Sequence, residues 1–592
     1  MNALRADVAK WRDSGYENAS QVTKKLLTHW TRGDRKRRFF FCQLEAVETI
    51  IYINEILASG RRTRFNQAVT PPDYAAMIKG EKPPLAVSMS DEFFPRLCDQ
   101  PWDESQRALT RYGCKMATGS GKTVVMAMLV AWSFCNRGAV PGDTRFPSAV
   151  VVACPNLTVR ERLQVLRTDG DPEKSYYAIF DIVPPTLRNL LSFGRVMVTN
   201  WHAFAPESEH SEGGATYAVV QKGEEGADAF ARRVLRDLYG RGEILVMNDE
   251  AHHAYRPAPP EEAVKTKKKK GDESGFGEVS EEDQKEATVW VEGLDKLNAS
   301  VGVRCCIDLS ATPFYLGGSG YIEGSPFPWL VSDFGLVDAI ESGITKIPRL
   351  PVADTSGRPD PKFFRLWDEI KRQLKAQGDA NFDRGKPKPE ATWRQAQPAF
   401  AMLAAQWQER FEQHREAKGG QTFIPPVIIV VCDNTDMAQV FFEKISGETV
   451  EEISDEEDDG TVTTRKERRH NPDGVPFPDL ANTAGRTVTL RIDSKLLAEA
   501  EIGTATGSKL KEAERLRELI ANVGKPGTPG EHIRCVVSVQ MLTEGWDANN
   551  VTQILGLRAF GRPRPRGAGP PVRYSPCWSE PSAWLRTRRY ST

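Results

Sequence analysis

Residues 116–123, with the sequence MATGSGKT, decide the fold of this chain. Gly119 and Gly121 let the backbone turn so that successive N–H groups converge on one phosphate group. The apolar residues that follow are predicted to form a helix whose positive N-terminal end faces the same point. Lys122 is then placed to reach the β- and γ-phosphates of a nucleotide, and the Thr123 hydroxyl to ligate Mg²⁺.

The usual form of this motif, G-x-x-x-x-G-K-[S/T], has glycine where the chain has Met116. On its own, the stretch therefore also fits a glycine turn that caps an ordinary helix. Its assignment depends on partner motifs elsewhere in the sequence.

The composition of the 592 residues is that of a soluble globular protein with about three or four domains. Lysine and arginine (79) nearly cancel aspartate and glutamate (80), so any basic track for a nucleic acid must be local. The ten cysteines form no C-x-x-C pair and are predicted to be reduced core thiols. Because the sequence has no membrane-spanning apolar run and no signal peptide, we expect a cytoplasmic protein without a membrane partner.

Apolar runs alternate with helical segments downstream of the phosphate loop, and each run ends in polar residues. The four runs are predicted strands at residues 149–155, 196–202, 244–247 and 305–309. Strands separated by helices imply an α/β fold with a parallel sheet that binds ligands at the carboxyl ends of its strands.

The same pattern restarts near residue 346 and predicts a second α/β domain without a phosphate loop of its own. Residues 362–417 look helical, and the predicted strands are 427–431, 487–492 and 533–539. Two charged segments interrupt the chain. Residues 257–288 are predicted to be a disordered insertion, with a phosphate-contacting loop as the alternative, and residues 447–485 a long loop or excursion.

The acidic pair Asp249-Glu250, at the end of the third predicted strand, supplies groups that phosphoryl transfer needs. Asp249 is placed to hold Mg²⁺, usually through water, and Glu250 to orient or deprotonate an attacking water. His252 and His253 have no third ligand at a spacing that suits a metal site, so His252 is interpreted as a polar coupler between nucleotide and neighbouring domain.

Gln43 follows three phenylalanines at residues 39–41 and precedes a helix-like apolar stripe. A glutamine amide can bond adenine N6 and N7 while an aromatic ring packs against the base. The segment also fits a capped core helix, and on this segment alone we favour the helix.

A loose nuclease pattern, P-D…E-x-K, occurs at Pro359-Asp360, Glu369 and Lys371. The carboxylates of such a site normally lie on adjacent strands, where they share a metal. Here residues 363–374 carry apolar side chains at helical spacing, which favours a helix with ordinary surface charge.

Several segments together resemble the ordered motifs of superfamily 2 helicases. Motifs I, Ia, Ib, II, III and V are similar to MATGSGKT, ACPNLTVRERL, VTNWHAF, NDEAH, LSATP and LTEGWDANNVTQILGLRAF. The residues of these motifs are most similar to those of the restriction (Res) subunit of type III restriction enzymes and related DEAD/DEAH-box proteins. The resemblance spans about residues 38–560, and in this group the first position of motif I need not be glycine.

The resemblance implies two tandem RecA-like domains, with ATP and Mg²⁺ in the cleft and DNA across the top. Residues 1–345 would hold an N-terminal segment and the ATP-binding domain, and residues 346–561 the second domain. Lys122, Asp249 and Glu250 would carry hydrolysis, with Thr123 and Asp249 on the metal. The nucleotide contacts would be Gln43, Thr118, Gly119, Ser120, Gly121, Lys122, Thr123, Gly545 and Asp547. His252, Ser310 and Thr312 would couple hydrolysis to nucleic acid, and Asn156, Thr199, Asn200 and Thr543 would contact its phosphate backbone.

The resemblance ends near Gly561. Family members continue with a helix carrying Q-x-x-G-R-x-x-R (motif VI), whose arginines reach the γ-phosphate, and then a nuclease domain. Residues 562–592 are instead rich in arginine and proline, and the prolines forbid that helix. We expect a shift of reading frame here, which the coding DNA after codon 560 would reveal; an arginine-rich tail for DNA contact is the alternative.

Together these features predict the ATP-dependent DNA translocase or helicase motor of a restriction system, with a modification methyltransferase as a possible partner. Without the motif VI arginines, hydrolysis is expected to be slow, because arginine fingers contribute roughly 10³ to 10⁵ in rate. The alternatives are a hydrolysis-deficient nucleic-acid-binding remnant and an RNA or DNA helicase without a nuclease role.

Overall fold

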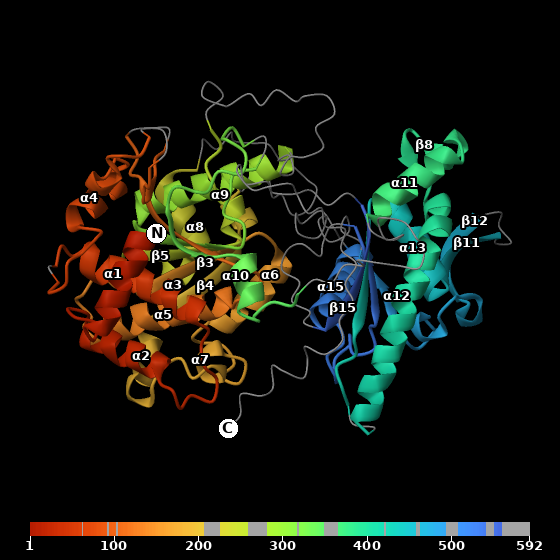
Figure 1. Cartoon of the computed structure of the whole chain (residues 1–592), viewed down its shortest axis with the longest axis horizontal. Helices are drawn as coiled ribbons and strands as arrows, with labels where there is room; N and C mark the ends of the chain where they lie inside the picture. Colours follow the sequence, from red (N-terminus) through yellow and green to blue (C-terminus); the bar gives the residue numbers. More distant parts are fainter. Residues whose placement is uncertain are drawn as a thin grey trace. The chain divides into compact units, whose positions relative to one another are not determined.

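The computed structural model describes residues 1–61, 63–90, 94–101, 105–205, 225–258, 281–316, 319–347, 365–419, 422–456, 462–492, 507–539 and 550–558. These residues form two compact units, drawn from Met1–Thr345 and Lys346–Phe560 (Figure 1). The predicted Arg/Pro-rich tail, residues 562–592, lies outside the described residues.

The first unit is built on a largely parallel sheet. Its strands are β1 (Cys98–Asp99), β2 (Leu109–Met116), β3 (Ala149–Cys154), β4 (Arg195–Asn200), β5 (Ile244–Asp249), β6 (Val303–Ser310) and β7 (Leu330–Phe334). They lie in the order β1-β2-β6-β5-β3-β4, with β7 also paired to β2, and only β1 is antiparallel to its neighbour. The prediction of an α/β fold with a parallel sheet is confirmed.

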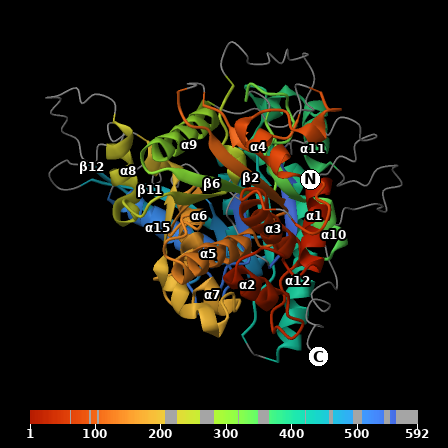
Figure 2. The same ribbon diagram turned by 90° about the vertical axis from the view of Figure 1, so that its left-hand side faces the viewer.

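Helices cover both faces of this sheet, which explains why its strands read as unbroken apolar runs. The helices are α1 (Asn2–Asp13), α2 (Gln21–Thr31), α3 (Phe41–Tyr52), α4 (Pro71–Lys79), α5 (Lys122–Ala139), α6 (Leu157–Leu163), α7 (Tyr176–Ile179), α8 (Ala227–Leu235), α9 (Glu281–Ser300) and α10 (Leu336–Glu341). Figure 2 shows α9 on one side of β2 and β6, and α3 and α5 on the other. Val150 and Val152 of β3 pack in the core beneath α5, while Val151 and Ala153 pack in the core beneath α8 and α9.

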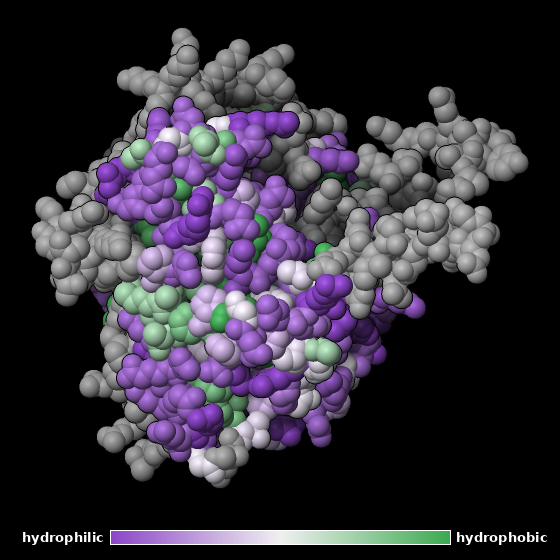
Figure 3. Space-filling view, turned by 90° about the vertical axis from the view of Figure 1, so that its right-hand side faces the viewer, coloured by the Kyte–Doolittle hydropathy of each residue, from purple (hydrophilic) through white to green (hydrophobic). Residues whose placement is uncertain are grey.

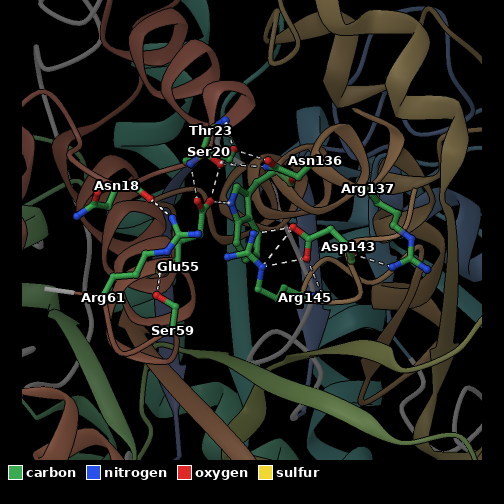
Figure 4. Close-up of polar contacts among 11 residues, drawn as sticks. Asn18, Ser20, Thr23, Glu55, Ser59, Arg61, Asn136, Arg137, Asp143 and Arg145 are labelled. Carbon is green, nitrogen blue, oxygen red and sulfur yellow. Dashed lines mark hydrogen bonds and ion pairs between the residues drawn. The ribbon is translucent and has the colours of Figure 1, made fainter. Parts of the chain in front are cut away.

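A buried polar cluster fixes α5 to the N-terminal helices (Figure 4). Glu55 lies in a turn of π-helix that follows α3, and its carboxylate is 2% exposed. It accepts hydrogen bonds from the Ser20 N–H at 2.8 Å, the Thr23 hydroxyl at 2.5 Å and the Trp132 indole at 2.8 Å. Asn136 donates to the Thr23 hydroxyl at 3.0 Å. These donors satisfy the buried carboxylate and hold α5 in place.

The second unit also places helices on both faces of a parallel sheet. Its main strands, β10 (Val427–Cys432), β13 (Thr489–Arg491), β14 (Cys535–Ser538) and β15 (Val551–Leu557), lie in the order β13-β14-β10-β15. One face packs against α11 (Leu366–Ala376), α12 (Pro389–Ala417) and α13 (Thr435–Ser446), and the other against α15 (Ser508–Ala521).

Three predictions on helices and insertions are refined by the structure. The helical region predicted at 362–417 is two helices, because Gly378 and Gly385 take positive φ around a short hairpin of β8 (Phe382–Asp383) and β9 (Lys386–Pro387). The helix preferred over the nuclease pattern is confirmed as α11, although Pro359-Asp360 lies outside the described residues. The last part of the insertion predicted at 257–288 belongs to α9, which begins at Glu281, and residues 259–280 lie outside the described residues.

The prediction of a long loop at 447–485 is wrong in its first half. There β11 (Glu448–Glu456) and β12 (Val462–His470) pair as an antiparallel hairpin of nine residue pairs. The register pairs Glu452 with Lys466, but it also pairs Glu451 with Glu467. The two strands lack the regular apolar alternation from which strands are usually predicted, so the sequence did not reveal them.

None of the described helices is both long and apolar enough to cross a bilayer. The face shown in Figure 3 is mostly hydrophilic, with hydrophobic residues in small patches. All nine cysteines within the described ranges are buried and unpaired, as the sequence predicts for core thiols.

Candidate nucleotide site

The phosphate loop forms a tight turn between the end of β2 and the start of α5. Gly119 and Gly121 take left-handed φ values of +83° and +88°, which glycine adopts without strain. The Ser120 hydroxyl donates to the Ala117 carbonyl at 2.6 Å. The Ala117 N–H in turn donates to the Phe334 carbonyl of β7 at 2.9 Å, so the loop is anchored to the sheet.

Gln43 braces this loop from α3. Its Nε2 donates to the Ser120 carbonyl at 3.0 Å, and its Oε1 accepts from the Phe40 N–H at 2.9 Å. A Cβ on Gly121 would lie 2.1 Å from Gln43 Nε2, so the amide packs directly on the loop backbone. The interpretation as a capped core helix is confirmed, whereas adenine recognition by Gln43 stays a prediction.

Lys122 and Glu250 form the central ion pair of the site, with Nζ 2.8 Å from Oε1. Both side chains are largely buried, at 10% and 14% exposure. Glu250 has a φ of +48°, which is uncommon for a residue other than glycine and typical of functional sites. This turn at the end of β5 directs the carboxylate back towards the start of α5.

Asp249 ends β5 with a carboxylate that is 1% exposed. Its Oδ2 lies 3.4 Å from Nη2 of Arg162 on α6, and its Oδ1 accepts no hydrogen bond from any described residue. Burial raises the pKa of Asp249, against the opposing effect of the Lys122 charge.

The donor set at this position suits Mg²⁺, a hard cation that takes oxygen ligands. The orphaned Asp249 Oδ1 and the hydroxyl of Thr123, the second residue of α5, are such ligands. Within the described ranges no three His, Cys, Asp or Glu side chains converge on one point. A cation here would therefore depend on phosphate and water oxygens as well as on Asp249 and Thr123.

His252 and Ser310 join the ends of β5 and β6. Nδ1 of His252 lies 3.0 Å from the Ser310 hydroxyl and 3.7 Å from Oε2 of Glu250. The Thr312 N–H donates to the same hydroxyl at 3.0 Å. The structure thus brings the three predicted coupling residues together, with His252 next to Glu250 of the acidic pair.

The residues predicted to contact the nucleic-acid backbone lie at the ends of β3 and β4. The Asn156 side chain accepts from the Val159 N–H at 2.9 Å and so caps α6. The Thr199 hydroxyl donates to the Asn200 carbonyl at 3.3 Å, and Nδ2 of Asn200 lies 3.1 Å from a ring nitrogen of His202. Both side chains are buried, so a phosphate contact through them stays a prediction.

Of the remaining predicted site residues, Thr118 is described and three others are not. Thr118 belongs to the loop, where its carbonyl accepts from the Thr345 hydroxyl at 3.3 Å. Thr543, Gly545 and Asp547 lie outside the described residues.

Sequence analysis missed a buried charged cluster beneath the site. Arg111 of β2 is fully buried and donates to Asp308 Oδ2 at 2.7 Å and to Asp99 Oδ2 at 2.9 Å. Asn248, next to Asp249, donates to Asp308 Oδ1 at 2.8 Å. The cluster joins the strands that carry the phosphate loop, the acidic pair and Ser310. Asp308, a charged residue between Ile307 and Leu309 in a predicted strand, was the sequence feature that could have revealed it.

A scan against protein-family models gives no match, and neither does a search of the curated proteins.

Proposed function

We propose that this chain is an ATP-dependent DNA translocase or helicase of the superfamily 2 type, with two tandem RecA-like domains. In this proposal it is the motor of a restriction system, similar to the restriction subunit of type III enzymes. The observation that carries the proposal is the convergence of Lys122, Asp249 and Glu250 at the carboxyl ends of parallel strands, where α/β sheets bind ligands.

The residues divide the work of ATP hydrolysis between them. The loop amides and Lys122 bind the phosphates, and Thr123 with Asp249 holds Mg²⁺, which when bound neutralises charge on the transferred phosphoryl group. Glu250 orients or deprotonates the attacking water once Lys122 has moved from Glu250 to phosphate. Its contact with His252, which in turn contacts Ser310, offers a route by which the site communicates with bound nucleic acid.

Partners and location belong to the same proposal. The motor would follow double-stranded DNA along its backbone, and a methyltransferase would be its partner subunit. A cytoplasmic location is supported by the buried, unpaired thiols of the described residues.

DNA-stimulated ATP hydrolysis, compared between the wild-type chain and Lys122→Ala, tests the proposal. We expect Mg·ATP binding by the wild-type chain, turnover that rises with added double-stranded DNA, and loss of both in Lys122→Ala. DNA binding without a difference in hydrolysis between the two proteins would favour the hydrolysis-deficient remnant. Stimulation by RNA rather than DNA would favour an RNA helicase.

A further inference from the structure

Arg162 is a charged partner of Asp249. None of the roles proposed for the motif residues includes it. It lies in the last turn of α6, and its side chain is 31% exposed beside the buried carboxylate. Lys122 is paired with Glu250 at 2.8 Å, whereas Arg162 Nη2 lies 3.4 Å from Asp249 Oδ2.

This contact is loose compared with another buried arginine–aspartate pair of the same unit. Arg256 holds Asp295 through two hydrogen bonds of 2.8 and 3.0 Å. The contact of Arg162 with Asp249 uses one nitrogen at a longer distance and leaves Oδ1 unbonded. A buried carboxylate needs a neighbouring positive charge, but this geometry lets the charge be exchanged.

We infer that Arg162 stands in for the divalent cation at Asp249 and withdraws when the carboxylate ligates that cation. The inference rests on the proposed function, because it takes Asp249 as the metal-holding carboxylate. Arg162 is then a positioning residue whose charge competes with the cation for Asp249.

Because Arg162 lies on α6, its withdrawal from Asp249 affects that helix. This short helix is capped by Asn156 and follows β3, which pairs with β5 beside Asp249. Asn156 is one of the residues predicted to contact nucleic acid. Withdrawal of Arg162 therefore removes one contact between α6 and the end of β5 when the cation binds, which links the nucleotide site to the helix that Asn156 caps.

Cation binding, measured without turnover, tests the inference. Manganese(II) serves as the probe, and the electron paramagnetic resonance of free Mn²⁺ is titrated against protein saturated with ADP. Arg162→Gln removes the competing charge, so we expect Mn²⁺ to bind roughly two- to fivefold more tightly than in the wild type. Arg162→Lys restores the charge and is expected to return the affinity towards the wild-type value.

Arg167→Gln is the matched control, because it removes one guanidinium close to α6 from an exposed pair with Asp169. Its Mn²⁺ affinity should equal that of the wild type. Arg162→Met, which keeps the aliphatic stem, replaces Arg162→Gln if circular dichroism shows that the latter does not fold.

The outcomes separate the inference from the proposed function. Unchanged or weaker Mn²⁺ binding in a folded neutral variant at position 162 overturns the inference, as does weaker ADP binding with Mn²⁺ affinity unchanged. If the wild-type chain and Lys122→Ala both show no ADP-dependent Mn²⁺ binding, the proposed function itself fails.

Discussion

Gly121 of the phosphate loop is constrained both by its backbone conformation and by a close neighbouring side chain. Its φ is +88°, and an added Cβ would lie 2.1 Å from Gln43 Nε2. Gly119 has a similar φ of +83° but nothing within 4 Å of the Cβ position. We expect Gly119→Ala to lower the free energy of unfolding by about 1–2 kcal/mol through backbone strain. Gly121→Ala should lower it by about 2–5 kcal/mol, because overpacking adds to that strain. Urea denaturation measures both.

A double-mutant cycle isolates the contribution of the Gln43 amide. Gln43→Ala should recover part of the stability lost in Gly121→Ala and none of that lost in Gly119→Ala. Equal losses in the two glycine variants would contradict the close contact between Gln43 and the loop.

Asp249, the residue proposed to hold Mg²⁺, occupies a position that destabilises its charged form. Burial raises the pKa of its carboxyl above that of an ordinary aspartate. A carboxyl with a higher pKa in the folded than in the unfolded chain holds its proton more tightly when folded. Its stabilising contribution is therefore complete below the unfolded pKa and is lost as the pH rises through the folded pKa. We expect Asp249→Asn to avoid this loss and raise stability at neutral pH by roughly 1 kcal/mol, while hydrolysis is lost.

Thermal unfolding of Asp249→Asn and the wild type at several pH values measures this effect. The stability difference should grow as the pH rises from acid to neutral. A constant difference would show that the charge on Asp249 is not its source.

The residues of this site could be predicted only in part from the sequence. Lys122, Asp249 and Glu250 stand beside recognisable glycines or at the end of an apolar run, so local pattern was enough to single them out. The contacts of Gln43 and Arg162 depend on how α3 and α6 pack beside the loop and β5. No local pattern carries that information.

At the element scale, Arg111 links the strands on which the site depends. Burial alone would lower its pKa, but Asp308 and Asp99 reverse this effect and raise it. We expect Arg111→Met to destabilise the fold by about 3–5 kcal/mol, because it leaves the Asp308 carboxylate buried without its cation. Arg107→Met is the matched control, since Arg107 is exposed and lies 3.6 Å from Glu243, and its effect should be about 0–1 kcal/mol. Denaturant titration of both variants checks the difference, and similar losses would contradict it.

The strands and the hairpin show which elements sequence patterns reveal. β3 and β10 lie under helices on both faces, so every position had to be apolar and each strand could be predicted. The hairpin of β11 and β12 has no such constraint. Its two strands are rich in charged residues, and its register joins residues as far apart in the sequence as Glu448 and His470.

At the scale of the whole molecule, each unit has its own core. The two hydrophobic clusters that flank the first sheet draw their residues from 1–345, and those of the second sheet from 346–560. Every described residue of the candidate nucleotide site also lies in the first unit. We therefore expect a fragment of residues 1–345 to fold alone and to bind nucleotide.

Ligand-dependent unfolding of this fragment provides the measurement. Mg·ADP at a hundred times its Kd should stabilise it by about 2.7 kcal/mol, and the same fragment with Lys122→Ala should show no such shift. The fragment should nevertheless lack DNA-stimulated hydrolysis, because a RecA-like motor completes its site with groups from the second domain. Stimulated turnover by the fragment would contradict the two-domain motor while leaving the nucleotide site intact. Failure of the folded fragment to bind Mg·ADP, with binding by the full chain, would instead show that the second unit is needed to form the site.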